Sequence, residues 1–224
     1  MCMDFSQLGR EIAELERAGV DELHFDIMDG AFVPNITMGF EAIRAARKVT
    51  KLPFTAHLMI VQPERYIHRF AEEGCKTITI HAESTRHPHR AIQQIRDSGA
   101  APGLALGPAT PLYTANFLVG QLQKILVMAV EPGFVGQRAI PDISVRIEKV
   151  KQLVTDRSVH VAIGVDGNVS AENVDELVRA GASFLVLGTS SIFNQPVRPG
   201  VALRSFRDRI NNATAGLTNR CPIG

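Results

Sequence analysis

Apolar and polar residues follow one repeating pattern along the chain: an amphipathic helix, a glycine, and then a short apolar strand. Residues 11–19 read EIAELERAG before the strand-like LHFDI, and residues 171–181 read AENVDELVRAG before ASFLVLG. Glycine is typical just past a helix end because it adopts the left-handed conformation without a Cβ clash. We expect strands at 22–28, 53–59, 77–82, 102–106, 124–130, 159–166 and 183–188, and helices near 5–18, 39–49, 63–73, 87–98, 111–119, 139–154, 171–180 and 199–211.

Strict alternation of strands and helices predicts parallel strand pairing with right-handed crossovers. The helices outnumber the convincing strands by one, because only Met1–Asp4 precede the first helix. We therefore predict an α/β fold, a (β/α)₈ TIM barrel whose first strand is truncated at the N-terminus. Residues 1–210 would form this single catalytic domain and 211–224 a flexible C-terminal tail. An open doubly wound sheet is the alternative, although no G-x-G-x-x-G follows a strand.

Composition excludes several classes of protein. The chain has 224 residues, of which 45% are hydrophobic and 21% charged, and its net charge is +1. Dispersed basic residues predict neither nucleic-acid binding nor a polybasic membrane patch, and no apolar run is long enough for a membrane span. The three widely separated cysteines indicate neither a disulfide framework nor a zinc knuckle, which favours a cytoplasmic protein.

Strand alternation turns four ionisable residues toward the barrel interior. His24 and Asp26 share one face of the first predicted strand, opposite Leu23, Phe25 and Ile27, which belong against the helices. His57 and Asp166 face inward near the ends of two other strands. Two imidazoles and two carboxylates at the C-terminal rim can bind one divalent metal ion. Singly, an inward histidine is more often a hydrogen-bonded core residue, and a strand-end aspartate is often a helix N-cap.

Other inward residues predict the walls of a substrate pocket. Methionines occupy inward positions on three strands and could form an apolar floor, although a core methionine is usually filler. His81 is expected to line the pocket, whereas Asp29 faces the other way and should order its loop by accepting backbone N–H groups. Ala162 and Gly164 are small and should leave room inside the barrel. The three methionines are Met28, Met59 and Met128.

Three glycine-bearing loops follow strands on the same rim and predict an anion site. Barrel enzymes often bind phosphate there with backbone N–H groups and a short helix N-terminus. A single G-T-S-S stretch is a weak signal, because it also fits an ordinary turn. The candidate residues are Gly133 and Gly136, Gly167 and Asn168, and Gly188, Thr189 and Ser190.

A metal beside two aspartates, with a phosphate anchor across the rim, suits proton abstraction next to a ketone. One carboxylate would remove the proton and the other would return it from the opposite face. An aldolase or decarboxylase using a Schiff-base lysine is disfavoured, because Lys76 and Lys124 begin their strands and lie on the wrong rim. A non-catalytic sugar-phosphate-binding barrel is a further alternative.

Five motifs carry a resemblance to the ribulose-phosphate 3-epimerase family. They are LHFDIMDGAFVPNITMG (Leu23–Gly39), AHLMI, HAE (His81–Glu83), EPGFVGQ, and VDG followed by GTSSIF. The resemblance implies a metal-dependent epimerase that interconverts D-ribulose 5-phosphate and D-xylulose 5-phosphate through an enediolate, and a homo-oligomer. It implies one divalent metal (zinc, iron, manganese or cobalt) on His24, Asp26, His57 and Asp166, with Asp26 and Asp166 as the two acid/base residues. It also implies substrate contacts from His57, the methionines and the three loops.

The sequence departs from the family pattern in ways that bear on the substrate. MCMD stands where ribulose-phosphate enzymes read Ser-Ala-Asp, and the first-strand segment with its substrate-contacting serine has no counterpart. Val135 and Asn168 each replace a glycine of the family loops. MCMD, Asn168 and the GTS turn are similar to the D-allulose-6-phosphate 3-epimerase branch. A D-allulose 6-phosphate/D-fructose 6-phosphate epimerase is therefore the alternative function.

Overall fold

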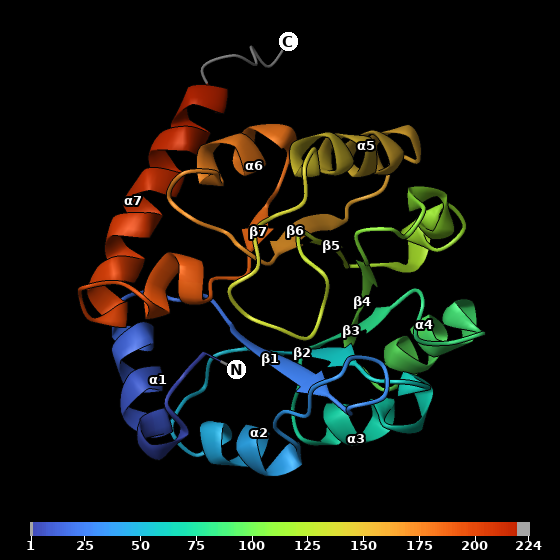
Figure 1. The fold of residues 1–224 in the computed structure, drawn as a ribbon. Helices are drawn as coiled ribbons and strands as arrows, with labels where there is room; N and C mark the ends of the chain where they lie inside the picture. The colour runs from blue at the N-terminus through green and yellow to red at the C-terminus, as the bar shows by residue number, and fades with distance from the viewer. Residues whose placement is uncertain (1, 219–224) are drawn as a thin grey trace.

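The computed structural model describes residues 2–218 of the chain and places side chains through residue 214. Met1 and residues 219–224, which include Cys221 and the end of the predicted tail, lie outside the described residues. Helices surround a curled parallel sheet (Figure 1). The strands are β1 Leu23–Met28, β2 Phe54–Met59, β3 Thr77–His81, β4 Ala101–Leu106, β5 Lys124–Met128, β6 Ala162–Asp166 and β7 Phe184–Leu185. The helices are α1 Leu8–Arg17, α2 Phe40–Arg47, α3 Ile67–Glu72, α4 Pro88–Asp97, α5 Ile143–Asp156, α6 Val174–Ala180 and α7 Pro199–Thr218.

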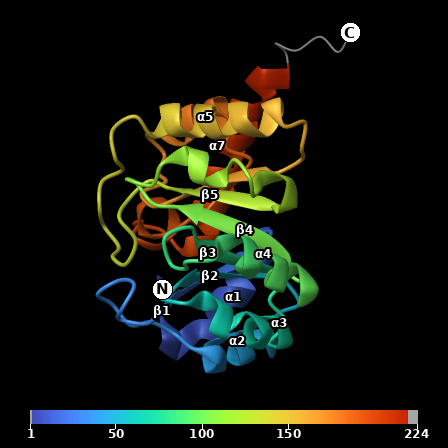
Figure 2. The ribbon, with the colours of Figure 1, turned by 90° about the vertical axis from the view of Figure 1, so that its right-hand side faces the viewer.

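Within residues 2–218 the strands pair in chain order, from β1 to β7, and every pairing is parallel. The side view in Figure 2 shows the helices packed outside the curled sheet. In the described part of the chain β1 and β7 do not pair with each other, so the barrel has a seam between them. This arrangement confirms the predicted barrel with one strand fewer than a closed (β/α)₈ sheet.

The first described residues lie along this seam. Met3 packs against both the main apolar core and a smaller cluster that includes Leu15 and Leu203, and Cys2 lines the cavity inside the barrel. Asp4 caps the 3₁₀-helix Phe5–Gln7 by accepting a hydrogen bond from the Ser6 backbone N–H, and α1 follows directly. Residues that were expected to be the tail of a strand therefore partly cover the seam and lead into α1.

The apolar faces of the strands pack against the helices, as alternation predicts. Leu23, Phe25 and Ile27 are buried in the main core together with apolar residues of the surrounding helices. One expectation about the interior is wrong. The space above Gly164 is filled by the Phe184 ring, which a Cβ at Gly164 would overlap. Phe184 from the neighbouring strand thus occupies the room that the small residues of β6 leave.

Two segments differ from the predicted elements. Residues 111–119 were expected to form one α-helix but form the 3₁₀ turns Leu112–Ala115 and Val119–Gln121. Leu112, Ala115 and Leu118 recur every three residues, which matches the period of a 3₁₀-helix. Ala115 and Leu118 are buried in the main core, so this spacing serves packing.

The last helix extends into the segment predicted as a C-terminal tail. Helix α7 continues to Thr218 and so includes residues 211–218. Its apolar face explains the extension, because Phe206, Ile210 and Ala213 follow one another at helical spacing and all contact the main core.

Candidate active site

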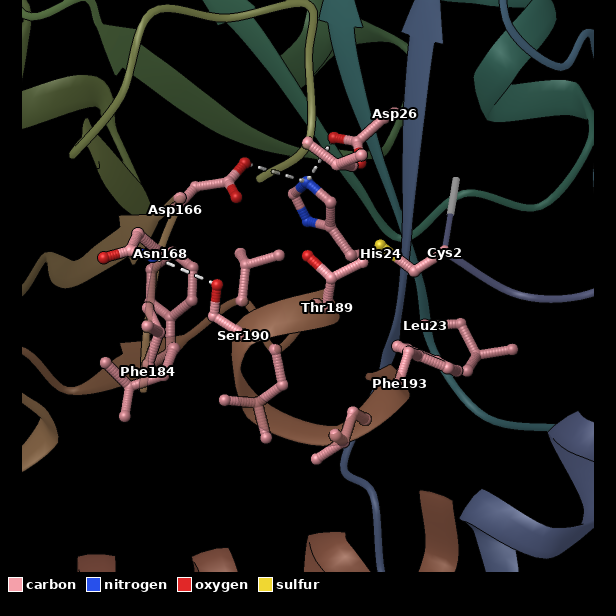
Figure 3. A pocket seen from close by; sticks show the side chains of 18 of the residues that line it. Cys2, Leu23, His24, Asp26, Asp166, Asn168, Phe184, Thr189, Ser190 and Phe193 are labelled. Carbon is pink, nitrogen blue, oxygen red and sulfur yellow. Dashed lines mark hydrogen bonds and ion pairs between the residues drawn. The ribbon is translucent and has the colours of Figure 1, made fainter. Parts of the chain in front are cut away.

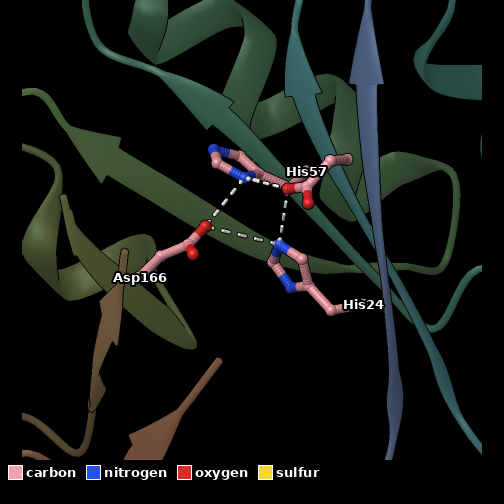
Figure 4. A group of neighbouring side chains, drawn as sticks. His24, His57 and Asp166 are labelled. Atoms are coloured by element: carbon pink, nitrogen blue, oxygen red, sulfur yellow. Dashed lines mark hydrogen bonds and ion pairs between the residues drawn. The ribbon is translucent and has the colours of Figure 1, made fainter. Parts of the chain in front are cut away.

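Four ionisable side chains converge where β1, β2 and β6 end. His24 points inward from β1, His57 from β2 and Asp166 from the last position of β6 (Figure 4). Asp26, two residues after His24 on β1, joins them (Figure 3). The parallel register pairs Asp26 with His57 and Met128 with Asp166, which holds the polar residues at one level of the barrel. One ligand atom from each of the four side chains lies within 4.8 Å of the others.

The individual distances describe a compact cluster. His57 Nδ1 lies 3.2 Å from Asp26 Oδ1 and 3.4 Å from Asp166 Oδ2. His24 Nε2 lies 3.3 Å and 3.7 Å from the same two oxygens. A single oxygen of each carboxylate takes part, so Asp26 Oδ2 and Asp166 Oδ1 stay outside the four-atom group.

These donors fit a divalent metal ion. A tetrahedral ion with bonds of about 2.1 Å to nitrogen and oxygen separates its ligand atoms by about 3.4 Å, close to the distances observed here. His24 Nε2 is buried without an aligned hydrogen-bond partner, although it faces two carboxylates. A buried polar atom of this kind needs a partner, and a cation would provide one. The residues could therefore hold a divalent metal.

The cluster strongly perturbs two protonation equilibria. Burial alone would raise the pKa of Asp26, but hydrogen bonds and positive charge from His24 and His57 hold it far below its usual range. Burial alone would lower the pKa of His57, but its contacts with Asp166 and Asp26 raise it to about 9. Without a metal, a proton on His57 Nδ1 thus lies between the two carboxylates.

This proton predicts how the metal-free protein responds to pH. A histidine whose pKa is about 9 when folded, against about 6.5 unfolded, stabilises the fold below pH 6.5 and loses that contribution as the pH rises toward 9. The free energy of unfolding of the chelated protein should fall over this range by at most about 3 kcal/mol. Urea unfolding at several pH values measures it. The His57→Asn variant should lack this slope, and an equal slope in both proteins would contradict the assignment.

The cavity inside the barrel adjoins the cluster and has a volume of about 940 Å³. Figure 3 shows His24, Asp26 and Asp166 together with Asn168, Thr189 and Ser190 around it. His57 differs from the other predicted substrate contacts, because it is fully buried and does not line the cavity. The predicted residues that do line it are Met28, Met59, Met128, Gly133, Gly136, Gly167, Asn168, Gly188, Thr189 and Ser190.

The rim loops are tied together by two asparagines whose contacts the sequence did not reveal. Asn168 donates from Nδ2 to Ser190 Oγ at 3.1 Å and accepts the Ala139 backbone N–H with Oδ1 at 3.3 Å. Asn35 Nδ2 donates to the Gly133 carbonyl at 2.8 Å, which joins the loop after β1 to the loop that crosses the barrel mouth from β5 (Figure 1). Asn168 has a φ of +48°, a left-handed conformation that asparagine tolerates better than most residues.

The loop after β1 is ordered as predicted. Asp29 accepts the backbone N–H groups of Ala31, Phe32 and Val61 at 2.8–2.9 Å. The slight burial of Asp29 opposes its ionisation, but these hydrogen bonds lower its pKa. The structural role expected for Asp29 is confirmed.

His81 is placed differently from its prediction as a pocket wall. It is fully buried behind His57 and is not among the residues that line the cavity. Its Nε2 lies 2.9 Å from His57 Nε2, and its Nδ1 lies 3.3 Å from Glu83 Oε2. The only sequence signal for the contact between Glu83 and His81 is the HAE motif, in which Glu83 follows the inward-facing His81 by two positions.

Lys124 lies at the opposite rim, as expected for a residue that begins a strand. It pairs there with Glu22 at 2.8 Å.

The curled parallel sheet and the polar cluster at its C-terminal end define the class of TIM-barrel enzymes. The solved structure of KGPDC from Streptococcus mutans is similar over 93% of this chain and 92% of that chain, with a TM-score of 0.69 and 14% sequence identity. At this identity the likeness concerns the fold alone.

The sequence model of the ribulose-phosphate 3 epimerase family matches residues 1–193. Ribulose-phosphate 3-epimerase of Bacillus subtilis (strain 168) is 41% identical over 196 residues, which are 87% of this chain and 90% of the relative. Its counterpart from Synechocystis sp. is 42% identical over 195 residues, 86% of this chain and 84% of the relative. The chain belongs to the ribulose-phosphate 3-epimerase family and is an isomerase, an epimerase that acts on carbohydrates. Among residues 2–218, no helix has the length and apolar character needed to cross a membrane.

Proposed function

We propose that the protein interconverts D-ribulose 5-phosphate and D-xylulose 5-phosphate by epimerisation at C3. The observation that carries this proposal is the convergence of Asp26 and Asp166 from two non-adjacent strands onto one cluster beside the cavity. The names of the curated relatives support the substrate class.

The two aspartates would act from opposite faces of the substrate. One carboxylate removes the C3 proton to form the enediolate, and the other returns a proton to the opposite face, which inverts C3. The oxygens that stay outside the cluster, Asp26 Oδ2 and Asp166 Oδ1, are the atoms available for these transfers. The low pKa of Asp26 keeps it ionised at neutral pH, although burial opposes this.

His24, Asp26, His57 and Asp166 would hold one zinc, iron, manganese or cobalt ion. Such an ion supplies positive charge that stabilises the developing enediolate. The chain provides a nitrogen and oxygen donor set whose spacing suits it. The cavity beside the cluster gives the substrate a place next to these donors.

The apolar part of the site would hold the carbon skeleton. Met28 and Met59 pack together with Val33, and Met128 packs with Leu126 on the other side of the barrel. All three methionines line the cavity, so a polarisable surface lies beside the acidic cluster. This surface would exclude water from the reactive enediolate.

The glycine-rich loops would bind the phosphate group. Gly136 and Gly167 have positive φ values, +81° and +99°, which orient backbone N–H groups in ways that most residues resist. Gly188 precedes the short turn Thr189–Phe193, in which Thr189 and Ser190 line the cavity.

The open side of the cluster argues against a non-catalytic role. His24, Asp26 and Asp166 keep 12%, 18% and 15% of their side-chain surface exposed, and all three line the cavity. A purely structural metal site is normally closed by protein ligands.

Turnover of a substrate panel tests the proposal. Metal-loaded protein should epimerise D-ribulose 5-phosphate faster than D-allulose 6-phosphate. The hexulose phosphate is retained as a candidate because Val135 and Asn168 change the two loops at the phosphate end of the cavity. Faster turnover of the hexulose phosphate would overturn the pentulose assignment but keep the epimerase chemistry.

Asn168 gives a separate test of the phosphate site. Asn168→Gly keeps the left-handed backbone but removes both side-chain hydrogen bonds between the loops. Each lost bond is worth about 0.5–1.5 kcal/mol, so inorganic phosphate should inhibit the variant about tenfold more weakly, with kcat changed little. Competitive inhibition constants measure this effect. Unchanged inhibition would remove Asn168 from the phosphate site.

A further inference from the structure

Behind the candidate metal centre, two buried histidines and a partly exposed glutamate form a chain that the proposed reaction does not use. His57 Nε2 and His81 Nε2 lie 2.9 Å apart, and the two rings stack with centroids 5.0 Å apart. Both histidines are fully buried. The chain continues from His81 Nδ1 to Glu83 Oε2, 3.3 Å away, although this buried nitrogen has no aligned hydrogen-bond partner.

Hydrogen-bond rules fix the proton positions along this chain. A neutral imidazole carries a proton on only one nitrogen, so a His57 that offers the lone pair of Nδ1 to a metal has its proton on Nε2. His57 Nε2 then donates, and His81 Nε2 must accept. The proton of His81 is therefore on Nδ1, where it faces the Glu83 carboxylate.

Glu83 is itself held in place. Its Oε1 accepts the Gly107 backbone N–H at 2.8 Å, and a Cβ at Gly107 would come within 2.8 Å of that oxygen. The Arg146 guanidinium donates to the carbonyls of Gly107 and Thr110, both at 3.0 Å, which fixes the loop that carries this N–H. The carboxylate therefore faces His81 with its other oxygen.

The two histidines of this chain are also shielded from water, whereas the Glu83 side chain keeps 34% of its surface exposed. The Phe32 ring packs on His81 with centroids 4.8 Å apart, and Phe32 lies in the loop that Asp29 orders. Water can hardly replace His81 as the acceptor for His57 Nε2. A buried donor left without an acceptor costs about 1–3 kcal/mol, so loss of the His81 acceptor should destabilise the position of His57 in the cluster.

We propose that His81 and Glu83 are positioning residues that hold His57 in the tautomer and orientation a metal ligand needs. The inference rests on the proposed function, because it gives His57 the role of a metal ligand. Partners of this kind behind a ligating histidine typically change metal affinity about 10- to 100-fold when they are lost.

Matched variants separate hydrogen bonding from packing. Glutamine and methionine have similar length, but only the glutamine side chain offers a carbonyl acceptor near the position of His81 Nε2. His81→Met should bind Zn²⁺ about 10- to 100-fold more weakly than wild type, whereas His81→Gln should retain most of the affinity. Competition with a chromophoric chelator measures the affinities. Equal affinities of the two variants would overturn the proposal.

Glu83→Gln tests the second link. Its amide can accept the Gly107 N–H only by turning its NH₂ group toward His81 Nδ1–H, which pushes His81 into the wrong tautomer. We expect about tenfold weaker Zn²⁺ binding. Glu73→Gln is the control, since Glu73 pairs with Arg44 on the outer surface and should leave Zn²⁺ affinity unchanged. Zn²⁺ affinity of Glu83→Gln equal to that of the control would remove Glu83 from the chain.

Nitrogen-15 NMR of the imidazoles gives a readout that is independent of activity. His81 should carry its proton on Nδ1 and have a bare Nε2, both in the metal-free and in the zinc-loaded protein. A proton on His81 Nε2 would overturn the proposal. Failure of the wild-type protein to bind any divalent metal would instead refute the metal-dependent function, and the His81 tautomer would still decide the inference.

Discussion

Replacing Asp26 or Asp166 by asparagine is expected to lower kcat/KM for D-ribulose 5-phosphate by at least about 10³-fold. General acid–base groups typically contribute about 10²- to 10⁴-fold, and each aspartate also places an oxygen in the group of four atoms that could hold a metal. Activities should be compared at saturating metal, with bound metal measured for each variant. Asp175→Asn, which alters only an ion pair with Arg209 on the outer helices, is the control.

Proton exchange separates the roles of the two aspartates from their share in metal binding. Each epimer loses its C3 proton to the base on one face. A variant that keeps one base should still exchange the C3 proton of one epimer for deuterium from D₂O, but it should not form the other epimer. The two variants should show this exchange with opposite epimers. Activity of either variant within tenfold of wild type would contradict the two-base scheme.

Removal of the divalent metal should produce the second large effect, a loss of activity of at least about 100-fold. Without the cation, the enediolate loses a charge contribution of several kcal/mol. His57 then holds a proton between the two carboxylates, as its pKa of about 9 indicates despite burial. Dialysis against a chelator, followed by addition of zinc, iron, manganese or cobalt one at a time, measures both the loss and the recovery.

Stability provides a control for the metal effect. A metal present at 100 times its dissociation constant should raise the free energy of unfolding by about 2.7 kcal/mol, provided that it binds only the folded protein. His24→Ala should lose both this stabilisation and the reactivation, while a surface variant such as Glu73→Gln keeps them. Full activity of the chelated wild-type protein would refute a metal-dependent reaction.

Local periodicity explains why most of the fold could be predicted. All seven predicted strands are present within residues 2–218, because the apolar runs alternate correctly between helix-facing and inward side chains, and four of them follow a glycine that ends a helix. The same alternation placed His24, Asp26, His57 and Asp166 on one rim, and these residues do converge. Strand direction and side-chain alternation depend on short-range geometry, which a sequence displays directly.

Contacts between distant segments could not be predicted in this way. Phe184 fills the space above Gly164 because of how two neighbouring strands pack. The hydrogen bonds of Asn168 to Ala139 and Ser190 likewise depend on how separate loops come together. His81 was correctly placed inward, but its depth behind His57 follows from the register between β2 and β3. Likewise, 3₁₀ and α-helical periods are too similar to separate over a segment as short as 111–119.

The most direct test follows D-ribulose 5-phosphate with the metal-loaded protein in D₂O by NMR. We predict formation of D-xylulose 5-phosphate with deuterium at C3, at a rate above that for D-allulose 6-phosphate. Absence of C3 epimerisation with every pentulose and hexulose phosphate offered, despite bound metal, would contradict the assignment of this cluster as an epimerase site.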